Sequence, residues 1–60
     1  MGAQLKKCFD FVNAQGGLPM QMRLAMKLGV TSDKAAALPD DPAMVSKAKA
    51  VVKEITGKDV

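Results

Sequence analysis

The chain of 60 residues contains no histidine, no tryptophan and no tyrosine. Without histidine, the usual general base and the commonest metal ligand are missing. Phe9 and Phe11 are the only aromatic residues, so a platform of stacked rings for single-stranded nucleic acid is not expected. The carboxylates lie mostly at expected caps, loops and solvated faces, and none are paired for acid–base work. We therefore expect a protein that is not an enzyme and has no catalytic residues.

Cysteine occurs only once, as Cys8, which excludes an intramolecular disulfide and makes a reducing, cytoplasmic setting the default. Cys8 falls on an expected apolar stripe with no base beside it, so a buried small side chain is expected rather than a nucleophile. The apolar runs are too short to span a bilayer, and no signal-peptide pattern is visible. We expect a soluble cytoplasmic protein without membrane contact.

Strong charge of one sign is also lacking. Nine lysine and arginine residues against six acidic ones give a net charge of +3, and the cations are scattered along the chain. This favours ordinary solvation with a mild preference for anionic partners.

Methionine, in contrast, is frequent, with five in the chain. A soft metal site built from Cys8 and the methionines is disfavoured, because Met20 and Met22 would point about 200° apart on a helix. Methionine more often fills gaps in a core or at an adaptable surface. We expect no metal and no cofactor.

Residues that begin or end helices mark four helical segments. In residues 3–15 an apolar stripe recurs at helical spacing, and Gly16-Gly17 ends the segment. Pro19 suits the start of a second helix over residues 19–28, which Gly29 closes. The stripe of the first segment comprises Leu5, Cys8, Phe9 and Val12.

Capping residues mark the other two segments. Thr31 or Ser32 caps a short third segment that ends at Pro39. Asp41 and Pro42 open a fourth segment, which Gly57 closes. Its apolar residues fall within an arc of about 120°: Met44, Val45, Ala48, Val51, Val52 and Ile55. The pattern predicts an all-α fold, a small bundle of three main helices plus one short helical turn, as a single domain over residues 1–60.

Residues 24–38 resemble two families of small helical domains. Ala25 and Gly29, with apolar residues around them, resemble a helix-turn-helix; these are Leu24, Leu28, Val30, Ala35 and Leu38. The loop Leu28-Gly29-Val30 also resembles the ubiquitin-associated three-helix bundle, although Val30 is smaller than that family's usual residue. The first resemblance implies DNA binding and the second ubiquitin binding. The plainer interpretation is a corner between two short helices.

The expected DNA-reading helix lacks the chemistry of base recognition. It offers no Arg, Asn or Gln for bidentate contacts with base edges, and it runs into Asp40 and Asp41, which would repel phosphates.

The second helix is the most apolar segment, and its Met22 and Met26, together with Phe11 of the first helix, form the candidate interaction surface. If Leu24, Ala25 and Leu28 face the core, then Met22 and Met26 point away from it. Either the first helix covers them, or they stay exposed and meet a two-fold partner. The leading hypothesis is a non-enzymatic protein-interaction module that self-associates. The alternative is a small nucleic-acid-binding protein, which a contiguous lysine face would favour, whereas an exposed apolar patch would favour a protein partner.

Overall fold

The computed structural model describes residues 1–60, apart from the side chain of Ser32. Three helices appear in this part of the chain: α1 (Ala3–Lys27), α2 (Ser32–Ala35) and α3 (Pro42–Thr56). Helix α1 is interrupted at Gly17, whose φ of 72° and ψ of −163° are not helical. We call residues 3–16 the N-terminal arm of α1 and residues 18–27 its C-terminal arm. Two arms, α3 and the single turn of α2 confirm the predicted all-α bundle.

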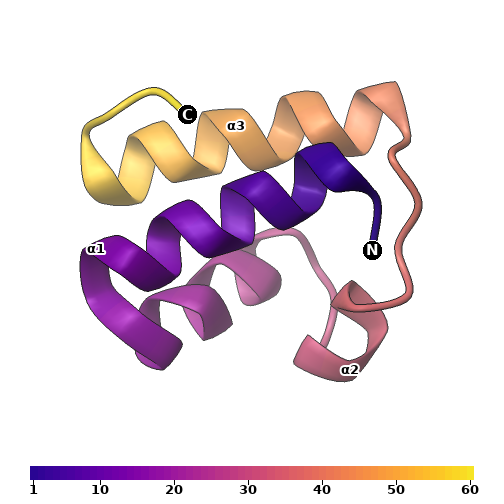
Figure 1. Cartoon of the computed structure of the whole chain (residues 1–60), viewed down its shortest axis with the longest axis horizontal. Helices are drawn as coiled ribbons and strands as arrows, with labels where there is room; N and C mark the ends of the chain where they lie inside the picture. Colours follow the sequence, from indigo (N-terminus) through magenta and orange to yellow (C-terminus); the bar gives the residue numbers. More distant parts are fainter.

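The break at Gly17 lets the chain reverse direction. Positive φ is costly for residues that carry a side chain, so glycine suits this position. Pro19 follows within the first turn of the C-terminal arm, where its missing N–H leaves no hydrogen bond unmade. As Figure 1 shows, the C-terminal arm then folds back beneath the N-terminal arm, while α3 lies alongside the N-terminal arm.

The predicted boundaries of α3 are confirmed. Asp41 lies just before the helix, and its carboxylate accepts a hydrogen bond of 3.2 Å from the backbone N–H of Ala43. Pro42 occupies the first turn, and Gly57 ends the helix in the left-handed conformation, with φ of 74°. These are the devices that satisfy backbone groups at helix ends.

Helix α2 is shorter than the predicted segment. Thr31 caps it, because the Thr31 hydroxyl oxygen accepts a hydrogen bond of 3.3 Å from the N–H of Lys34. The alternative cap, the Ser32 side chain, lies outside the described part of the chain. The N–H groups of Ala37 and Leu38 bond to carbonyls only three residues back, so the helix tightens into turns and stops before Pro39.

One buried cluster joins all three helices. Its members from α3 are Val45, Ala48, Val51 and Val52, with Met44 and Ile55 partly buried against them, which confirms the predicted core face. The remaining buried members are Leu5, Cys8, Phe9, Val12, Leu24, Ala25, Leu28 and Ala35. Because this core forms between the arms and α3, it positions the outer surface of the C-terminal arm.

Candidate functional site

Three large apolar side chains of the C-terminal arm remain exposed. The exposed fractions are 62% for Leu18, 49% for Met22 and 77% for Met26. Residues four apart lie above one another on a helix, so the three form one line, which we call the outer stripe. The arm can bury only one face, and Leu24 and Ala25 occupy that face. The outer stripe lies beside that buried face, and Met26 is the most exposed of its three residues.

The N-terminal arm does not cover the two methionines. Its apolar residues Leu5, Phe9 and Val12 are themselves buried in the core, and they leave Met22 and Met26 exposed. Of the two arrangements expected for this helix, the structure has the one in which the methionines stay exposed.

The third predicted member of the surface, Phe11, lies elsewhere. It is half-buried and packs against the core. Side chains two apart on a helix point about 200° apart, and Phe9 faces the C-terminal arm, so Phe11 points to the other side of the N-terminal arm. Leu18 takes its place beside the methionines. Sequence reasoning missed Leu18 because it precedes the predicted start of the helix, although its four-residue spacing from Met22 was a usable signal.

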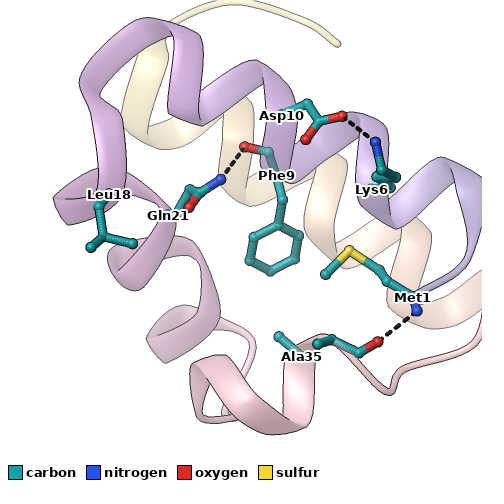
Figure 2. A pocket seen from close by; sticks show the side chains of 8 residues that line it. Met1, Lys6, Phe9, Asp10, Leu18, Gln21 and Ala35 are labelled. Atoms are coloured by element: carbon teal, nitrogen blue, oxygen red, sulfur yellow. Dashed lines mark hydrogen bonds and ion pairs between the residues drawn. The ribbon is translucent and has the colours of Figure 1, made fainter.

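A groove of about 420 Å³ adjoins the outer stripe at Leu18. Figure 2 shows the ring of Phe9 pointing into the space between the two arms and α2, with Met1 opposite Leu18. The side-chain amide of Gln21 donates a hydrogen bond of 3.2 Å to the carbonyl oxygen of Phe9, which ties the arms together. The lining residues are Met1, Lys6, Phe9, Asp10, Leu18, Gln21, Ala35 and Ala36.

The charges beside the outer stripe are positive. Arg23 and Lys27 form the neighbouring row of the C-terminal arm, and the arm carries no acidic residue. Lys27 pairs with Glu54 of α3 at 3.2 Å. Arg23 is exposed and makes no ion pair with the side chains that the structure describes. On the groove side, Lys6 and Asp10 neutralise each other at 3.1 Å.

The Cys8 thiol is buried, with 1% of the residue exposed. Burial raises the pKa of this thiol, and the positive charges of Lys49 and Lys7 oppose the increase only in part. A raised pKa keeps the thiol protonated and unreactive at neutral pH. Cys8 therefore acts as a core residue, as predicted.

The described residues contain no cluster of three or more metal-binding side chains that could hold an ion. None of their helices has the length and apolar character needed to cross a bilayer.

The segment that resembles two known families turns its apolar residues inward. Leu28 is 4% exposed, and Val30 is half-buried against the core, while Gly29 makes the turn with a φ of 81°. The helix that would enter DNA is the four-residue α2. In comparisons with known proteins, no family model, curated protein or solved structure matches this chain.

Proposed function

We propose that this chain is a non-enzymatic protein-interaction module that contacts its partner through the outer stripe and the adjoining groove. The observation that carries the proposal is the exposure of Leu18, Met22 and Met26 in one line on one helix. Single exposed apolar residues are common on protein surfaces, but a contiguous apolar strip marks a contact site more often. Methionine suits such a site because its unbranched side chain adapts to the opposing surface.

The small size of the domain strengthens the proposal. A chain of this length buries only about 60% of the surface that its unfolded form exposes, so apolar contacts are scarce. Three large side chains left outside the core contribute little to the stability of the isolated domain. A partner that covers them would bury their apolar surface and so stabilise the complex. A single free cysteine buried in the core fits a reducing, cytoplasmic setting for this interaction.

Capture from native lysate tests the proposal, with the wild-type chain and two variants as bait. Met26→Lys places a charge in the outer stripe, and Ala50→Lys places the same charge at an exposed position of α3. We expect the same proteins to bind the wild type and Ala50→Lys but not Met26→Lys. Equal capture by all three would contradict the proposed surface.

Circular dichroism of Met26→Lys is the control for folding. Because Met26 is 77% exposed, we expect the helix content to be unchanged. Loss of helix content would place Met26 in the core and remove the basis of the proposal.

A further inference from the structure

We propose that the outer stripe binds an amphipathic helix of a partner protein that carries acidic side chains beside its apolar ones. This inference rests on the proposed function, and it adds the chemical class of the partner.

The shape suits a helix. The outer stripe runs from Leu18 to Met26 and is about 12 Å long at 1.5 Å per residue. The groove beside Leu18 widens the surface and offers the ring of Phe9 at its floor. A partner helix presents apolar residues in a similar line, at spacings of three and four residues, and can place one of them in such a groove.

The positive charge next to the outer stripe indicates which kind of helix would bind there. Turning round the C-terminal arm at about 100° per residue leads from the outer stripe to the row of Arg23 and Lys27. The guanidinium of Arg23 lacks an ion-pair partner among the described side chains, and the arm carries no carboxylate of its own. Arginine beside an apolar strip is typical of interfaces, where it forms bidentate pairs with carboxylates. A partner with Asp or Glu along that flank would complete this pairing.

A second copy of the chain fits the charges less well. In an antiparallel two-fold pairing, equivalent flanks meet, so Arg23 would lie beside Arg23 of the other copy. In a parallel pairing the basic flank would meet the groove side, where Lys6 and Asp10 already pair with each other. Neither arrangement supplies Arg23 with a carboxylate. The self-association expected from the methionines alone is therefore the weaker alternative.

Two synthetic peptides of about 15 residues, a length that supports helix formation in water, test the inference. Both carry the same row of leucines on an alanine background, flanked by glutamates in one peptide and by lysines in the other. Binding to the full chain is followed by fluorescence anisotropy at low salt. We expect the glutamate peptide to bind about two- to fivefold more tightly, the effect of one or two exposed ion pairs. We expect this preference to shrink with added salt.

Matched variants test whether Arg23 causes the preference for the glutamate peptide. Arg23→Glu should abolish or reverse the preference. Lys7→Glu changes the charge equally on the N-terminal arm, away from the outer stripe, and should retain it. Met26→Lys should weaken the binding of the glutamate peptide, because it removes an apolar contact from the outer stripe.

Three results would overturn the inference. The first is equal binding of the two peptides, or tighter binding of the lysine peptide. If Met26→Lys still weakens the binding of both peptides, the proposed function stands and only the inference of an acidic partner is wrong. The second is a dimer in sedimentation equilibrium that Met26→Lys dissociates, which assigns the surface to a second copy. The third is binding of neither peptide by the wild type, and lysate capture then tests the proposed function separately.

Discussion

The carboxylate of Asp40 accepts a hydrogen bond of 3.1 Å from the backbone N–H of Leu5, which lies 35 residues earlier in the chain. Its second oxygen accepts from the N–H of Gln4 at 3.0 Å. The first N–H groups of a helix have no partner within it, and Gly2 at the N-cap makes no side-chain hydrogen bond. A β-carbon at Gly2 would overlap the Asp40 carboxylate, so glycine permits the approach. Asp40 thus caps α1 from the loop before α3.

We expect Asp40→Ala to lower the free energy of unfolding by about 1 kcal/mol, the usual effect of losing a helix cap. The negative charge also suits the positive end of the helix dipole. Urea denaturation measures the change. Asp59→Ala removes an acidic residue from an exposed ion pair with Lys53 at 3.6 Å, and should change stability by less than about 0.5 kcal/mol. Equal effects of the two substitutions would argue against the capping role.

Val52→Asp should unfold the domain. Val52 is fully buried, and a buried carboxylate without a partner costs several kcal/mol, comparable to the ~3–5 kcal/mol that a core of this size provides. Circular dichroism should show loss of helix content at room temperature. Ala50→Asp, at an exposed position of the same helix, is the control and should remain folded. A thermal melt unaltered by Val52→Asp would refute the core assignment.

We expect Cys8 to make the stability of the domain fall at alkaline pH. Burial raises the pKa of the folded thiol above its ordinary value of 9.0, so above that pH the unfolded chain releases a proton that the folded chain keeps. The stabilising contribution is therefore complete below the ordinary pKa and is lost as pH rises through the folded one. Urea denaturation between about pH 8 and 10 should show a steeper decline for the wild type than for Cys8→Ala. Parallel declines would exclude this linkage.

Binding to random duplex DNA should be weak. The helix that would enter the major groove, α2, has only four residues, and Lys34 is its single cation. Scattered positive charge supports only non-specific contacts, for which dissociation constants are about 10⁻⁴–10⁻⁶ M at physiological salt. A fluorescence titration under these conditions measures the affinity. Binding tighter than micromolar would revive the nucleic-acid alternative.

Local signals in the sequence determined the helices and much of the core. Gly17, Gly57 and the Asp41-Pro42 pair act on backbone groups within a few residues of themselves, so their effect can be predicted without knowing the rest of the fold. The apolar arc of α3 was likewise predictable, because helical periodicity alone decides which side chains share a face.

The tertiary structure decided which apolar residues stay outside the core and how α1 is capped. Met22 and Met26 share a face by periodicity, but only the packing of the two arms shows that the described side chains leave both of them exposed. The same packing separates Phe11 from that surface and adds Leu18 to it. The cap that Asp40 provides joins residues 35 apart, and no local pattern marks it. Burial and long-range hydrogen bonds depend on the meeting of distant segments, and so they become determined only when the chain is folded.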